Sequence, residues 1–257
     1  MRKYFSFFKI VFKNEVSKLY DSLGTVFGFC VHIIIFCLLW EYVLGSKTMA
    51  GYTREMLIWY AIFGEAIIYS YHNYFKSVSR QVEQGDIAYD MSKPYNYVLR
   101  IISEGLGLLP LTSVLFLAGS IIGIIFARNI DISITAVLCS IPIIIMACLL
   151  LLCVHIIIGL LAMWIGKDTS SVWLVVQKFM LIFAFTPLEF MPKCLQKALL
   201  CLPTTHIIYT PSKLLINFSY RRLGISILYE LGSFIILGCI FYIIYKKGVK
   251  KLNVNGI

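Results

Sequence analysis

Long stretches without charge constrain the fold of this chain more than any other feature. The longest, Ile132–Gly166, runs for 35 residues without a charged side chain. A helix needs about 20 mostly apolar residues to cross the hydrocarbon core of a bilayer. The chain is 60% hydrophobic and only 14% charged, whereas soluble domains carry about 25% charged residues. The sequence therefore predicts an all-α polytopic membrane protein.

Six stretches are apolar enough to be read as transmembrane helices of a single domain over residues 1–257. Their expected bounds are about 23–44, 56–75, 105–127, 142–164, 171–186 and 225–245. The fourth is placed in the second part of the longest run, because 35 residues are too many for one upright span. No apolar run precedes residue 23, so the N-terminus is read as mature sequence rather than as a signal peptide.

Lysine and arginine are distributed unequally between the two sides of these spans. With the N-terminus inside, the cytoplasmic segments hold fourteen of them and the outer segments eight. Cytoplasmic loops are enriched in these residues, so both termini are predicted to be cytoplasmic. The net charge of +10 fits basic segments beside anionic lipid. No basic segment is long or interleaved with base-stacking aromatic residues, so no nucleic-acid partner is expected.

Residues 1–20 are amphipathic. Apolar side chains recur at helical spacing, while Lys9 and Lys13 fall on another face. The apolar positions are Phe5, Phe8, Phe12, Val16 and Leu19. This pattern predicts an N-terminal helix that lies in the cytoplasmic interface of the membrane.

Residues 187–223, between the fifth and sixth spans, form a segment too apolar to lie freely in water. Pro203 and Pro211 divide its uncharged part into pieces that are too short to span. Non-helical backbone at membrane depth is tolerated only against protein or a water-filled cavity. We therefore predict two short re-entrant or interfacial helices on the outer side. Cys194 and Cys201 lie here, and unpaired thiols are favoured over a disulfide.

Two charged residues lie midway along predicted spans, whereas Glu230 lies near the start of the sixth. Glu65 is midway along the second and Lys178 midway along the fifth. Charged groups at such positions usually face the interior of a bundle or a cavity. They are expected to line a substrate path or to pair with each other; for Lys178, snorkelling to an interface is an equal alternative.

The sequence contains none of the common motifs of catalysis or nucleotide binding. G-x-x-x-x-G-K-[ST], G-x-S-x-G and H-E-x-x-H are all absent, and no His/Cys cluster has metal spacing. We therefore expect no catalytic, metal-binding or cofactor-binding residue and no enzyme activity. A self-contained secondary transporter or channel subunit using Glu65 and Lys178 is the main alternative, although no internal repeat supports it. A non-transporting assembly factor is a further one.

The cytoplasmic connection 76–104 is the most informative stretch for function. It mixes charges with tyrosines and aliphatic residues and is punctuated by Gly85 and Pro94. A solvated loop needs no such apolar residues. The segment is therefore predicted to dock on a cytoplasmic partner.

Three local patterns resemble the ABC-2 type transporter permeases. Gln84–Asn96, with its Gly-Asp-Ile and Lys-Pro-Tyr-Asn elements, is similar to that family's loop after the second span. Phe185–Gln196 followed by Leu202-Pro203 is similar to its segment after the fifth span, and the residues concerned are Pro187, Glu189, Pro192 and Pro203. The basic tail Tyr245–Lys251 is similar to its closing signature.

The resemblance implies a permease subunit of an ATP-driven exporter in a bacterial plasma membrane. Two permeases, identical or different, would enclose the path, and separate soluble ATPase subunits would bind ATP and Mg. The implied ATPase-coupling residues are Glu83, Gly85, Asp86, Asp90 and Pro94. The implied cargo is a peptide, an antibiotic or a lipid-like molecule.

Overall fold

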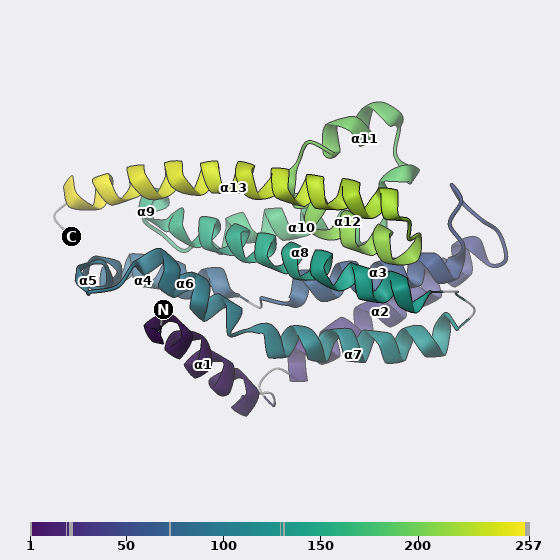
Figure 1. Ribbon diagram of the computed structural model, residues 1–257, viewed down its shortest axis with the longest axis horizontal. Helices are drawn as coiled ribbons and strands as arrows, with labels where there is room; N and C mark the ends of the chain where they lie inside the picture. The colour runs from purple at the N-terminus through teal and green to yellow at the C-terminus, as the bar shows by residue number, and fades with distance from the viewer. Residues whose placement is uncertain are drawn as a thin grey trace.

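The computed structural model is built from helices joined by short connections (Figure 1). It describes residues 2–18, 20, 23–71, 73–128, 130 and 132–254. The helices are α1 (Arg2–Ser17), α2 (Leu23–Leu44), α3 (Arg54–Tyr69), α4 (Tyr74–Glu83), α5 (Asp86–Ser92), α6 (Tyr97–Leu106), α7 (Leu109–Phe126), α8 (Ile134–Leu160), α9 (Ala162–Ile165), α10 (Ser170–Phe185), the 3-10 helix η1 (Leu188–Phe190), α11 (Lys193–Leu199), α12 (Pro203–Ile216) and α13 (Tyr220–Val254).

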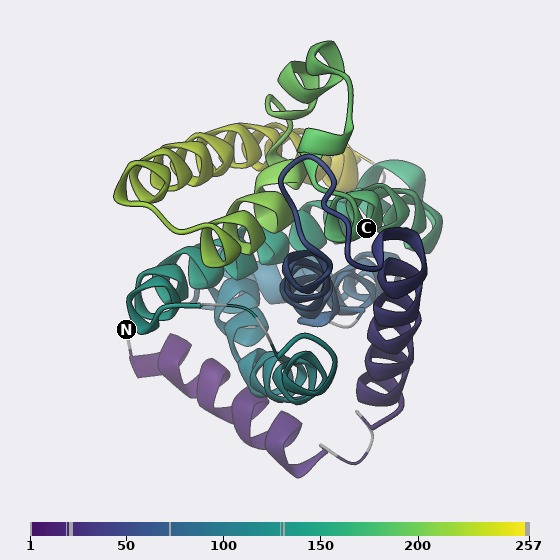
Figure 2. The same ribbon diagram turned by 90° about the vertical axis from the view of Figure 1, so that its right-hand side faces the viewer.

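The longer helices run along the long axis of the molecule and surround α3. Figure 2, which looks along that axis, shows α3 near the centre, and it packs against α2, α7, α10 and α12. Nearly all of α3 from Leu57 to Ile68 is buried. Gly64 permits this close approach, because an added Cβ would lie 3.0 Å from Ala184 Cα and 2.9 Å from Ile208 Cγ2. Small residues at helix contacts are typical of membrane bundles.

Four helical segments in the described part of the chain are long and apolar enough to cross a membrane. They are Leu23–Leu44, Tyr97–Phe126, Ile134–Ile165 and Tyr220–Lys250. The first has the predicted bounds of the first span. The second and fifth predicted spans correspond to α3 and α10, which have only 16 residues each. Sixteen residues extend about 24 Å, less than the hydrocarbon thickness of about 30 Å.

Several helix bounds differ from the predicted spans. The second span was expected to reach residue 75, but α3 ends at Tyr69 and α4 begins at Tyr74. Asn73 at this break has a φ of 57°, and asparagine tolerates the left-handed region better than most residues. The fourth span was expected to start at Pro142 after an interfacial lead-in, and α8 begins earlier, at Ile134, and continues through that proline. The sixth helix also extends beyond residues 225–245 at both ends.

Residues 187–223 fold into η1, α11, α12 and the first turn of α13. Pro203 occupies the first turn of α12, where a proline removes no helical hydrogen bond. The prediction that Pro211 divides this segment was wrong, because Pro211 lies inside α12. Packing of α12 against α3, α8, α10 and α13 compensates for the lost backbone bond. Cys194 and Cys201 are free and exposed, as unpaired thiols.

The N-terminal segment is a helix, as predicted, and lies obliquely against one end of the bundle (Figure 1). It contacts α6 and α7, and Val11 packs so closely on Gly107 that an added Cβ there would lie 2.7 Å from Val11 Cβ. Phe5 is 66% exposed, and Phe12 and Val16 are exposed as well. Leu19 lies outside the described residues. Part of the apolar stripe of α1 is therefore left uncovered by the protein.

Candidate functional site

A two-helix turn at one end of the bundle carries most of the predicted coupling residues. Glu83 ends α4, Gly85 precedes α5, and Asp86 is the first residue of α5. Gly85 has a φ of 75°, a backbone conformation that glycine adopts without strain. This turn lies at the same end of the molecule as both termini (Figure 1).

Asp90 organises the connection between α5 and α6 from the inside. Its side chain is 9% exposed and accepts hydrogen bonds from Lys93 Nζ at 2.7 Å, Tyr95 Oη at 3.2 Å and Arg100. Arg100 Nε also donates to Glu104 at 2.7 Å. Burial alone would raise the pKa of Asp90, but the hydrogen bonds from Lys93 and Arg100 outweigh it and lower that pKa. Asp90 is thus held within the chain rather than presented to a partner.

The other predicted coupling residues face outward. Glu83, Asp86 and Pro94 are exposed, and Tyr89 on α5 is 68% exposed with Lys93 Nζ 4.2 Å from its ring centre. We call these four residues, Glu83, Asp86, Tyr89 and Pro94, the loop surface. The pattern of exposure could not be read from the sequence, because α5 is too short to show a clear helical period.

The first turns of α1 are fastened to this connection. Lys3 Nζ donates to the carbonyl oxygen of Pro94 at 2.5 Å, and the backbone N–H of Asn96 donates to Tyr4 Oη at 2.9 Å. The rings of Phe7 and Tyr95 meet edge to face, with centroids 5.4 Å apart. Movement of the loop surface would therefore be transmitted to α1.

Glu65 and Lys178 do not pair. Glu65 is fully buried on α3, and its Oε1 lies 2.8 Å from His32 Nδ1 on α2. Tyr69 Oη lies 3.0 Å from the same nitrogen. Lys178 is exposed on α10, and none of the ion pairs found among the described residues joins it to Glu65. Pairing was one of two alternatives for these residues, and among the described residues Glu65 contacts His32 on α2 instead.

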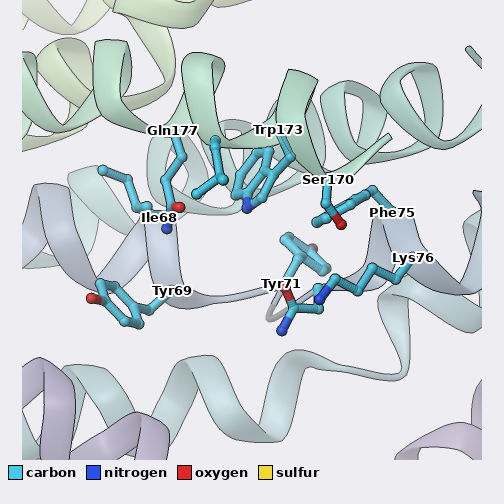
Figure 3. Close-up of a pocket in the computed structure, with 10 residues that line it drawn as sticks. Ile68, Tyr69, Tyr71, Phe75, Lys76, Ser170, Trp173 and Gln177 are labelled. Atoms are coloured by element: carbon cyan, nitrogen blue, oxygen red, sulfur yellow. The ribbon is translucent and has the colours of Figure 1, made fainter. Parts of the chain in front are cut away.

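A groove of about 320 Å³ lies where the break between α3 and α4 faces the start of α10 (Figure 3). The α3–α4 side contributes Ile68, Tyr69, Tyr71, Asn73, Phe75 and Lys76. The α10 side contributes Ser170, Trp173, Leu174 and Gln177. Gln177 stands out in the sequence as a polar residue of the fifth predicted span, but only the tertiary fold brings the two segments together.

Glu189 in η1 is hydrogen-bonded both to the loop before α3 and to α12. Its carboxylate accepts hydrogen bonds from Tyr52 at 2.9 Å, from Tyr209 at 2.7 Å and from Lys213. Burial would raise the pKa of Glu189, but the bonds from Lys213 and Tyr209 outweigh it and lower that pKa. Pro187 and Pro192 cap η1 and α11. The arrangement is a structural clamp between the loop before α3 and α12.

The described residues hold no group of three or more His, Cys, Asp or Glu side chains that could bind a metal ion. No curated protein matches the chain. A family model described as ABC-2 family transporter protein matches residues 28–256, which covers most of α2 and all the helices after it. The helical segments, their apolar length and this match agree: the chain belongs to the ABC-2 family of transporters and is a multi-pass membrane permease.

Proposed function

We propose that this permease is the non-catalytic membrane half of an ATP-driven exporter. The observation that carries the proposal is the exposed loop surface beside both chain termini (Figure 1). Soluble ATPase subunits dock on this surface and bind ATP and Mg, and a second permease, identical or different, completes the path. ATP binding drives the conformational change of the permease, because the ATPase subunits bind its two states with different affinities.

Six spans, with both termini in the cytoplasm of a bacterial cell, fit this function. The helices α3 and α10 are included although each has only 16 residues. Because α3 is enclosed by other helices, its ends meet protein rather than lipid and need not match the full bilayer thickness. By the same argument, α12 is re-entrant: it is largely buried among α3, α8, α10 and α13. The predominance of Lys and Arg at the end that bears the loop surface supports this orientation.

Charge reversal on the loop surface tests ATPase docking. Asp86→Arg replaces an exposed carboxylate and should abolish transport while leaving membrane insertion and thermal stability unchanged, because surface substitutions change stability by about 0.5 kcal/mol or less. Lys47→Glu, an exposed charge reversal at the opposite end, is the control and should transport normally. Normal transport by Asp86→Arg would contradict the docking proposal.

Purification in mild detergent followed by mass spectrometry tests the partners directly. We expect a stoichiometric ATPase carrying a phosphate loop to co-purify with the wild-type chain and to be lost from Asp86→Arg. An ATPase-free chain that transports its cargo alone would contradict the proposal.

A further inference from the structure

The groove between α3–α4 and α10 combines hydrogen-bond donors with a single positive charge. Lys76 is the only charged residue among the ten described residues that line it, and Asn73, Ser170 and Gln177 contribute polar groups. Figure 3 shows Ser170, Trp173 and Gln177 on one side and Phe75 and Lys76 facing them from the other. The lining thus favours an anion and contains no carboxylate that would compete with one.

Four backbone N–H groups beside the groove already have acceptors, which leaves its side chains as the main donors. The backbone N–H of Tyr74 donates to Tyr71, that of Phe75 to His155 Nδ1 at 3.4 Å, and that of Lys76 to Asn73. At the start of α10, the N–H of Ser170 donates to Asp168 Oδ2 at 3.2 Å. Lys76 Nζ is therefore the central group of the polar end.

The remaining wall is apolar and held in place by packing. Trp173 is buried, with its ring centroid 4.1 Å from that of His155 and 5.6 Å from that of Phe75. Leu174, which lines the groove beside it, is 52% exposed on the outer side of α10. The groove is consequently polar toward α4 and open along an apolar helix face.

We infer that this groove binds the anionic end of an amphiphile that enters from the cytoplasmic leaflet. The phosphate or carboxylate lies against Lys76, Asn73 and Ser170, and the apolar tail lies along Trp173 and Leu174. The groove lies at the end of α3 that is followed by α4 and the loop surface. This position suits cargo that leaves the inner leaflet. Naming the amphiphile as cargo rests on the proposed export function, whereas the anion site rests on the groove alone.

Binding of octyl phosphate to the purified full-length chain in phosphatidylcholine nanodiscs tests the site. Lys76→Gln should weaken binding about tenfold, as expected for the loss of one partly hydrated charge-assisted bond, and Lys76→Arg should restore it. Lys246→Gln is the matched control, because it removes an exposed lysine at the same end of the molecule, and it should leave affinity unchanged. Empty nanodiscs provide the partitioning baseline.

Two further probes separate charge from tail. Octyltrimethylammonium, with the same tail and the opposite charge, should bind at least about tenfold more weakly than octyl phosphate. Inorganic phosphate should bind more weakly still. Equal affinity of wild-type and Lys76→Gln for octyl phosphate would overturn the anion site. So would an affinity of the wild type for octyltrimethylammonium equal to that for octyl phosphate. An affinity for inorganic phosphate equal to that for octyl phosphate would overturn the assignment to an amphiphile.

Cargo and a resident phospholipid can both present an anionic head on an apolar tail. Transport measurements distinguish the two. Asp86→Arg should lose transport and keep octyl phosphate affinity, so failure of the export proposal leaves the binding result standing. Native mass spectrometry of the chain from its own membrane provides the other arm. A phospholipid retained one to one by the wild type and lost from Lys76→Gln would assign the groove to structural lipid and overturn the assignment to cargo.

Discussion

Asp90 shows how one buried carboxylate can hold a surface loop in shape. It accepts from Lys93, Tyr95 and Arg100 and closes the turn between α5 and α6. Because hydrogen bonds to charged groups contribute about 1.5–3 kcal/mol each, the network fixes the direction of α5. The exposed residues of the loop surface depend on this inner support, and Tyr89 contacts it through the Lys93 side chain.

Asp90→Asn should lower the free energy of unfolding by about 1–3 kcal/mol at neutral pH, because Arg100 and Lys93 lose their ionised partner. The folded chain lowers the pKa of Asp90 below its ordinary 3.8. Its stabilisation is therefore complete above that value and is lost as the pH falls through the folded pKa. Thermal melts from neutral to acidic pH should show the wild-type advantage shrinking. Asp86→Asn, at an exposed site, is the control; a similar loss in both variants would contradict the role of Asp90.

At the scale of elements, α3 is the helix that the others pack around. Its contact with α10 and α12 passes through Gly64, where an added Cβ would meet the Ala184 backbone of α10 and the Ile208 side chain of α12. The aromatic pair Phe36 and Phe185, with ring centroids 3.4 Å apart, joins α2 to α10. Positions on α3 are thus more sensitive to side-chain volume than positions on the outer helices.

Gly64→Val should destabilise the protein by about 1–3 kcal/mol, because overpacking forces α3 away from α10 and α12. Gly232→Ala on α13 is the matched change: an added Cβ there meets nothing within 4 Å, and replacing a helical glycine stabilises by up to about 1 kcal/mol. Thermal unfolding in detergent measures both. Equal melting temperatures for the two variants would show that the close contact at Gly64 is not needed.

At the scale of the whole molecule, the loop surface and the segment η1–α11 belong to opposite sides of the bundle. Both termini, α4 and α5 gather at one end (Figure 1), and Cys194 and Cys201 are exposed in the segment assigned to the outside. This arrangement makes sidedness measurable with thiol reagents.

A membrane-impermeant maleimide should label Cys194 and Cys201 in intact cells. In a Cys194→Ser/Cys201→Ser background, Ser92→Cys on α5 should be labelled only after permeabilisation, because α5 is assigned to the cytoplasm. The double variant alone is the control for the remaining cysteines, which face lipid or protein and lack the water that thiolate formation needs. Labelling of Ser92→Cys in intact cells would reverse the proposed orientation.

The sequence by itself determined the class of the protein, since uncharged runs of 20 or more residues have few stable environments other than lipid. It also gave the bounds of the helix expected as the first span, the N-terminal helix and the family, because each rests on a local pattern. The partner of Glu65, the inward direction of Asp90, the helical course through Pro211 and the groove at Lys76 were decided by tertiary structure. Each joins segments far apart in the chain or depends on packing that offsets a local preference, and neither periodicity nor composition encodes which distant helix will lie alongside.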